Sequence, residues 1–366
     1  MIQLMIRLLA LCLSLTLQPH AASAQHSTIK IGVMVCLTGA CMEMGTNSLH
    51  GIQLAQEEIN AAGGILGKKI ELVVQDTREM DSPKNAVSAY QYLRLDKDIK
   101  LIIGPTWTVG ALPLTPIIAR DRDIIVTSPS LGVESFNESA DNIFNLWPHD
   151  SIATKAPAKF AIDHGWDRVA VISDQFPWES TLAKVFREEY KRLGGKEALF
   201  VETTGNETDL RFLASRIKQA NPNALFLSNY TQIGLTGRAL RDLRVSLPML
   251  TILLENSQIA ISDGTLEGIY FAEYEAATAD FNERYFKKFK TQPGLASDTG
   301  YDTLRLYARA LEQSPSDSAL IKTLLESRFK GASGDIVFDA KGGMVKTPLI
   351  RMLSKGARVP AALYLD

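Results

Sequence analysis

Short apolar runs alternate with amphipathic segments along the first two thirds of the chain. Four runs rich in Ile, Val and Leu are typical of strands, at residues 29–35, 69–75, 101–104 and 124–127. After the first run, Leu49, Ile52, Ala55 and Ile59 recur at spacings of three and four residues, which predicts a helix with one buried face. Strands that alternate with helices favour parallel sheets built from βαβ units.

The same pattern then starts again. A second series of strands is predicted at residues 168–173, 196–202, 224–228 and 248–254, with helices between them. In the last third, three helical stretches follow one another without strands, at residues 278–289, 299–313 and 318–326. Two series of one plan predict two lobes of the same architecture, and we expect the helical segment to return to the first lobe.

The N-terminus has the pattern of an export signal. Arg7 precedes a mostly apolar run at residues 8–17, which is too short to cross a bilayer as a helix. Ala22-Ser23-Ala24 then gives the small-x-small pattern of a signal-peptidase site. We therefore expect residues 1–24 to be a signal peptide, cleaved after Ala24, and the mature protein to be periplasmic.

Composition and charge narrow the choice of partners. The 366 residues include 39 Lys and Arg against 41 Asp and Glu, for a net charge of −2, so nucleic acid is an unsuitable partner. Cys36 and Cys41 remain after cleavage, in a compartment where a disulfide is permitted, but their spacing leaves open whether they are bridged. No His or second Cys pair lies near enough to complete a metal site, so neither metal nor cofactor is expected.

The loops after the strands are the places where chemistry is expected. In open α/β sheets, ligands bind beyond the carboxyl ends of the strands. This rule selects six loops, at residues 36–45, 104–110, 128–133, 174–179, 228–234 and 255–257. If the two lobes face each other, all six loops would line one cleft.

Two of these loops offer donors for an anion. Thr106 and Thr108 lie where a strand is followed by a helix, so their hydroxyls and the free N–H groups of the helix start can hold a negative group, or Thr108 can simply cap the helix. Ser130 follows Pro129 in a turn that exposes its hydroxyl. The upstream glycine of a nucleophile elbow is missing, and no nucleophile–base pair is recognisable, so an enzyme is not expected.

One acid and three aromatic residues complete the candidate site. Glu255 ends an apolar strand, where a carboxylate is costly to bury without a cation or donors. It is either a solvated loop residue or a partner for a ligand ammonium group. Trp107, Trp178 and Tyr230 lie at the loop ends and supply broad apolar walls.

Several motifs follow one another in the order of a known family. They are Ile29-Lys-Ile-Gly-Val33, Gly51-Ile-Gln-Leu-Ala55, the Ala62-Gly-Gly-Ile-Leu-Gly-Lys68 turn, Val74-Gln-Asp76, Ser128-Pro129 and Tyr301-Asp302. The set resembles the periplasmic substrate-binding proteins of branched-chain amino acid ABC importers, of the leucine/isoleucine/valine type. The resemblance implies a type I periplasmic binding protein, with two Rossmann-like lobes whose parallel sheets are joined by three hinge crossings.

The resemblance also implies a division of the chain. Lobe one would comprise residues 28–146 and 275–335, and lobe two residues 147–274 and 336–366. The crossings would lie near residues 146–149, 271–275 and 334–338.

The ligand contacts implied by the resemblance fall in the loops selected above. Thr108 and the N–H groups around Thr106 would hold a ligand carboxylate, and the loop of Ser130, Leu131 and Gly132 would contact the carboxylate and the ammonium group. On lobe two, Glu255 would bind the ammonium group. Tyr230 and Trp178 would lie beside the ligand.

Three positions depart from the family pattern. Gly132 replaces a threonine that touches the head group, Trp107 stands where a small residue is usual, and Met44 replaces a common tyrosine. Because Thr108 and Glu255 are retained, we expect an amino acid or a close analogue, which need not be leucine.

These features lead to one main hypothesis of function. The chain is expected to be a monomeric solute-binding protein that delivers a small molecule to an ABC permease. The alternative is a ligand sensor of the same fold, for an amide or an aromatic acid, that is not coupled to transport.

Overall fold

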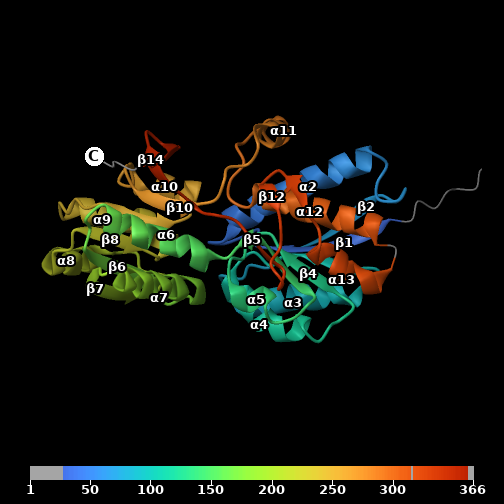
Figure 1. Ribbon diagram of the computed structural model, residues 1–366, viewed down its shortest axis with the longest axis horizontal. Helices are drawn as coiled ribbons and strands as arrows, with labels where there is room; N and C mark the ends of the chain where they lie inside the picture. Colours follow the sequence, from blue (N-terminus) through green and yellow to red (C-terminus); the bar gives the residue numbers. More distant parts are fainter. Residues whose placement is uncertain (1–27, 315, 362–366) are drawn as a thin grey trace, which may run out of the picture.

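The computed structural model describes residues 28–314 and 316–361, which form two lobes that lie side by side (Figure 1). The signal peptide expected at residues 1–24 lies outside the described residues. Among the described residues, no helix combines the length and the apolar character needed to cross a membrane.

Lobe one is built on a six-stranded sheet in the order β13-β5-β4-β3-β1-β2. All neighbouring strands in this sheet run parallel. The strands are β1 (Ile29–Val35), β2 (Ile70–Asp76), β3 (Leu101–Ile103), β4 (Ile125–Ser128), β5 (Ile143–Pro148) and β13 (Gly343–Met344). The first four follow the apolar runs of the sequence, whereas β5 and β13 carry no such run.

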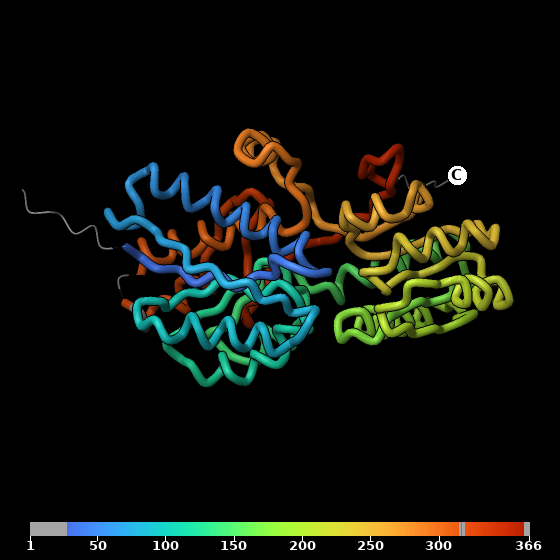
Figure 2. Tube along the Cα trace, turned by 180° about the vertical axis from the view of Figure 1, so that it is seen from behind, coloured from blue at the N-terminus to red at the C-terminus, as the bar shows by residue number. Residues whose placement is uncertain are grey.

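Helices from two distant parts of the chain cover this sheet. The first set is α2 (Met42–Ala61), α3 (Pro83–Leu95), α4 (Thr108–Ile118) and α5 (Glu134–Asn137). The second set is α11 (Ala279–Phe289), α12 (Ser297–Gln313) and α13 (Asp317–Leu325), which lies beside the N-terminal elements (Figure 2). Helix α12 packs closely on α2, because Gly51 has no side chain: a Cβ there would lie 1.8 Å from the Ser297 carbonyl oxygen.

Lobe two is built on a seven-stranded sheet in the order β15-β14-β10-β9-β8-β6-β7. Its strands are β6 (Arg168–Asp174), β7 (Lys196–Thr203), β8 (Ala224–Leu227), β9 (Met249–Ile252), β10 (Tyr270–Glu273), β14 (Leu349–Ser354) and β15 (Ala357–Pro360). The five strands from β6 to β10 are parallel, and β14 joins them antiparallel. Its helices are α6 (Asp150–Asp163), α7 (Pro177–Arg192), α8 (Arg211–Ala220), the 3-10 turn η1 (Tyr230–Gln232), α9 (Ile233–Asp242) and α10 (Asn256–Ser262).

The chain crosses between the two sheets three times. It leaves lobe one after β5 and returns after β10, close to the positions suggested by the sequence. The third crossing follows β13, which pairs with β5 in lobe one, so it falls after Met344 and not near residues 334–338. Residues Gly334–Ile336 form β12, which pairs instead with β11 (Phe329–Gly331).

Candidate functional site

The loops at the carboxyl ends of both sheets meet in a cleft between the lobes. About 480 Å³ of space in this cleft is not occupied by protein atoms, part of it open to solvent. Its lining residues are Met44, Met80, Thr106, Trp107, Thr108, Val109, Ser130, Leu131, Gly132, Asp150, Phe176, Pro177, Trp178, Glu179, Tyr230 and Leu253. Five of the six loops selected from the strand ends therefore contribute to one lining, and the loop at residues 255–257 does not. Of the ten ligand contacts expected from the sequence, all except Glu255 lie in this lining.

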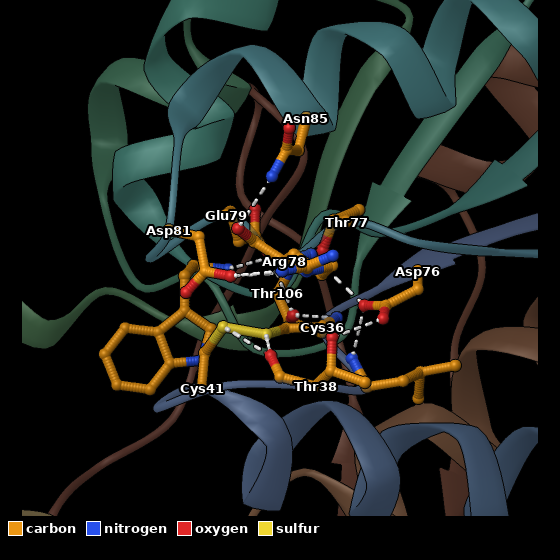
Figure 3. Close-up of a disulfide and its surroundings, with 12 residues drawn as sticks. Cys36, Thr38, Cys41, Asp76, Thr77, Arg78, Glu79, Asp81, Asn85 and Thr106 are labelled. Carbon is orange, nitrogen blue, oxygen red and sulfur yellow. Dashed lines mark hydrogen bonds and ion pairs between the residues drawn. A yellow bond between two sulfur atoms is a disulfide. The ribbon is translucent and has the colours of Figure 1, made fainter.

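A buried carboxylate that the sequence did not single out shapes the loop before α4. Oε1 of Glu79 accepts hydrogen bonds from the backbone N–H groups of Thr106 at 3.2 Å and Trp107 at 3.1 Å, and from the Thr106 hydroxyl at 2.9 Å (Figure 3). Burial raises the pKa of Glu79 to about 7, against the opposing effect of these donors. Glu79 thereby fixes the backbone that presents Thr108 to the cleft.

The three hydroxyl groups predicted at the site differ in whether they remain free to hydrogen-bond to a ligand. The Thr106 hydroxyl donates to Glu79 and accepts from the Cys36 N–H at 3.1 Å, and the Ser130 hydroxyl donates to the Thr106 carbonyl at 2.8 Å. The Thr108 hydroxyl forms no hydrogen bond with any residue that the structure describes, and the N–H groups of Thr108 and Val109 at the start of α4 likewise have no partner there. Thr108 is therefore the group best placed to donate to an anion.

Cys36 and Cys41 form a disulfide, which the sequence left open, with their Cα atoms 5.8 Å apart (Figure 3). The bridge closes the short loop between β1 and α2. A Cβ at Gly45 would lie 1.7 Å from the Cys36 carbonyl oxygen, so the absence of a side chain lets α2 pack against the end of β1. This arrangement carries Met44 into the cleft lining.

Aromatic rings from both lobes face each other across the cleft. The ring centroids of Trp107 in lobe one and Tyr230 in lobe two are 6.0 Å apart, and those of Trp178 and Tyr230 are 5.1 Å apart. The Tyr230 hydroxyl and the Trp107 indole nitrogen are buried without a hydrogen-bond partner among the described residues. The cleft therefore combines apolar walls with a few polar groups that a ligand could satisfy.

Two acids that were not predicted lie in the same lining. Oδ1 of Asp150 accepts from the Trp147 indole N–H at 3.1 Å, and Oδ2 accepts from the Trp178 indole N–H at 2.8 Å. Burial raises the pKa of Asp150 to about 7, and it raises the pKa of Glu179 well above its ordinary value. In the sequence, Asp150 could have been selected because it directly follows the first crossing, and Glu179 because it lies at the start of a helix that follows a strand.

Glu255 is buried outside this lining, at the start of α10. Its Oε1 atom has no hydrogen-bond partner among the described residues. Burial and the nearby Glu43 carboxylate raise the pKa of Glu255 to about 8, while Arg358 acts in the opposite direction. Its predicted contact with a ligand ammonium group stays a prediction.

One pair of hydrogen bonds ties the lobes together beside the cleft. Glu43, in the first turn of α2, accepts from the backbone N–H groups of Asn256 and Ser257, each at 3.0 Å. These two donors belong to α10 of lobe two. Within the described part of the chain, no group of three or more His, Cys, Asp and Glu residues is arranged to hold a metal ion.

Two lobes with mostly parallel sheets, joined by three crossings around a cleft, define a type I periplasmic binding protein, as the sequence predicted. The family model described as periplasmic binding protein matches residues 28–354, and the chain belongs to this family.

Curated relatives agree with the resemblance seen in the motifs. The Leu/Ile/Val-binding protein BraC3 of Rhizobium johnstonii is 29% identical over 224 residues, which are 61% of this chain and 60% of the relative. The Leu/Ile/Val-binding protein homolog 2 of Brucella abortus is 26% identical over 335 residues, 88% of this chain and 89% of the relative. The match to BraC3 thus spans about three fifths of that protein, and the match to the Brucella protein spans most of it.

Solved structures share the fold over nearly the whole described chain. The leucine binding protein LivK of Thermotoga maritima has a TM-score of 0.84 and 25% identity, and the match covers 92% of this chain and 98% of that one. LivJ of Streptococcus pneumoniae, in complex with isoleucine, has a TM-score of 0.83 and 24% identity, with 91% and 98% covered. A solute binding protein of R. palustris in complex with benzoate has a TM-score of 0.82 at 15% identity, with 92% and 96% covered.

Proposed function

We propose that the chain is an extracytoplasmic solute-binding protein of an ABC importer, which binds an amino acid or a related small carboxylate between its lobes. The observation that carries this proposal is the cleft itself, whose walls come from both lobes and meet at Trp107 and Tyr230. Closing the hinge around a ligand would bury it between these walls. The names of the relatives, which are binding proteins for leucine, isoleucine and valine, support the same ligand class.

The ligand carboxylate would be held at the start of α4. There the free hydroxyl of Thr108 and the N–H groups of Thr108 and Val109 point to a single anion site at a helix N-terminus. The apolar part of the ligand would lie against Trp107, Trp178 and Tyr230, beside Met44 and the loop of residues 130–132. Glu255 would approach the ammonium group from lobe two.

The remaining parts of the proposal concern the setting of the protein. The mature chain would begin after Ala24, work in the periplasm as a monomer, and deliver its ligand unchanged to a membrane permease. Lobe one would comprise the residues around the six-stranded sheet, 28–146 and 275 to about the third crossing, and lobe two the rest. A sensor for an aromatic acid is the second candidate, favoured by the four aromatic residues in the cleft lining, Trp107, Phe176, Trp178 and Tyr230.

A ligand screen on the mature chain tests the proposal. Thermal shift against amino acids, amides and aromatic acids identifies stabilising compounds, and native mass spectrometry establishes a one-to-one complex. A ligand at 100 times its dissociation constant adds about 2.7 kcal/mol to the free energy of unfolding, which is a clear shift in Tm. If no compound of these classes stabilises the protein, the proposed function is wrong. Neighbouring permease genes, or their absence, separate transport from sensing.

A further inference from the structure

Asp150 occupies an unusual place for an acid. It starts α6 directly after the first crossing, is 2% exposed, and lies in the cleft lining. The indole N–H groups of Trp147 and Trp178 each donate to a different carboxylate oxygen, and the Asp150 backbone N–H donates to the Gly132 carbonyl at 2.8 Å. The two indoles, one from the crossing strand and one from lobe two, therefore hold the side chain in one orientation, and the backbone bond ties the start of α6 to the loop of lobe one.

The lack of a side chain at Gly132 makes room for this carboxylate. A Cβ at Gly132 would lie 2.2 Å from Oδ2 of Asp150, well inside van der Waals contact. The loop of residues 130–132 thus has a carboxylate beside it in the space that a side chain at position 132 would fill. Gly132 departs from the family pattern, and the Asp150 carboxylate occupies the space where a side chain at position 132 would lie. The two residues therefore form one structural feature.

The ionisable side chains that line the cleft include acids but no basic residue. None of the sixteen lining residues is Lys, Arg or His, whereas Asp150 and Glu179 are acids. A carboxylate can accept about four hydrogen bonds, and Asp150 receives one on each oxygen from the described residues. A buried carboxylate without a cation is costly, so a cationic group that enters the cleft gains from pairing with it.

We propose that Asp150 binds a protonated amine of the ligand, so that the cleft selects small apolar molecules that carry an ammonium group. This inference rests on the proposed function and names the group that the binding site recognises. The two indole donors fix the carboxylate toward the cleft, and the aromatic walls exclude water from the pair. Thr108 and the start of α4 then receive the opposite end of a zwitterion.

Matched ligands that differ only in the amine test this inference. Calorimetric titration compares leucine with 4-methylpentanoate, and phenylalanine with 3-phenylpropanoate, on the wild type, Asp150→Asn and the control Asp163→Asn. Asp163 is at the other end of the same helix, in an exposed pair with Lys159. In the wild type and the control, the better-bound amino acid is expected to bind about tenfold or more tightly than its amine-free analogue. In Asp150→Asn, that ratio is expected to fall to about threefold or less.

Each possible result supports or overturns the inference about Asp150. Amine-free acids that bind the wild type as tightly as their amino acids would overturn the inference and leave the proposed function standing. A ratio that survives in Asp150→Asn would also overturn it, and loss of the ratio in Glu255→Gln alone would assign the amine to Glu255. If the wild type binds none of the four probes and no other amino acid in the ligand screen, the inference fails, and if no compound of any screened class binds, the proposed function fails as well. Where Asp150→Asn lowers the Tm, Asp150→Ser, which keeps an acceptor for one indole in a smaller side chain, repeats the comparison.

Discussion

The two hydrogen bonds of Glu43 connect the lobes without lying among the residues that line the cleft. Glu43→Ala is therefore expected to weaken ligand binding from a position outside the cleft. Both bonds join α2 of lobe one to the backbone of Asn256 and Ser257 in lobe two, each at 3.0 Å. If the lobes separate, the bonds are lost, so the substitution weakens the closed arrangement. It also removes a negative charge that raises the pKa of Glu255.

The size of the effect follows from the type of bond. A hydrogen bond to a charged group contributes about 1.5–3 kcal/mol. Glu43 is half-buried, so solvent screens the pair, and about 1 kcal/mol for each bond is a reasonable value. A loss of about 2 kcal/mol corresponds to an affinity about 30-fold weaker.

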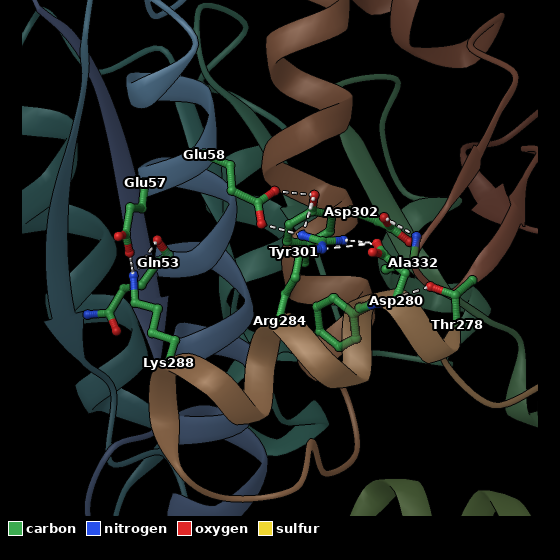
Figure 4. Close-up of polar contacts among 11 residues, drawn as sticks. Gln53, Glu57, Glu58, Thr278, Asp280, Arg284, Lys288, Tyr301, Asp302 and Ala332 are labelled. Carbon is green, nitrogen blue, oxygen red and sulfur yellow. Dashed lines mark hydrogen bonds and ion pairs between the residues drawn. The ribbon is translucent and has the colours of Figure 1, made fainter.

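Glu57 provides a matched control on the same helix. Its carboxylate pairs with Lys288 of α11, which belongs to the same lobe, so Glu57→Ala removes an acid from α2 without touching the contact between lobes (Figure 4). Calorimetric titration with the ligand from the screen should give Glu57→Ala an affinity within about twofold of the wild type. Equal affinities for Glu43→Ala and the wild type, or equal losses in both variants, would refute this account of closure.

Three further substitutions test the site and its electrostatics. Thr108→Val should weaken the binding of a carboxylate ligand by about 1–2 kcal/mol, because it removes the free hydroxyl at the start of α4. Thr115→Val on the same helix should leave the affinity unchanged, because the Thr115 hydroxyl donates to the Ala111 carbonyl. Glu255→Gln should reduce amino-acid affinity by about 2 kcal/mol if its carboxylate pairs with the ammonium group. Glu79→Gln should flatten the pH dependence of stability. Because the pKa of Glu79 is raised to about 7, the folded protein holds its proton at a pH where the unfolded chain releases it, and stability falls as the pH rises from about 4.5 through 7, by up to about 3 kcal/mol.

For each of these three substitutions, one result would contradict the expected effect. Titration that finds carboxylate affinity unchanged in Thr108→Val would remove the anion site from α4. Unchanged amino-acid affinity in Glu255→Gln would leave that acid without a role in binding. Urea unfolding at several pH values that gives wild type and Glu79→Gln parallel curves would mean that Glu79 is ionised in the folded protein at neutral pH.

The sequence predicts the strands best where one apolar run makes a whole buried strand. This holds for β3, which contains only Leu and Ile, and for β1 and β6, in each of which four of the seven residues are Ile, Val or Ala. Strand β5 has Asn145, Trp147 and Pro148 among its six residues, and β13 has two residues in all, so their pairing depends on contacts that no local pattern encodes. For that reason the third crossing lies after Met344, later in the chain than the sequence predicts.

The cleft could be anticipated because its loops follow from the direction of parallel strands. Glu79 and Asp150 could not, because an acid that is buried by distant segments looks in the sequence like any solvated loop acid. Glu79 is covered by the loop at Thr106, and Asp150 by two indoles and by Gly132. Their burial is set by tertiary packing, and with it their raised pKa values.

Small-angle X-ray scattering of the mature chain, with and without the ligand from the screen, tests the central claim most directly. Capture of a ligand between two hinged lobes predicts a smaller radius of gyration in the bound state. An unchanged radius of gyration at saturating ligand would contradict it.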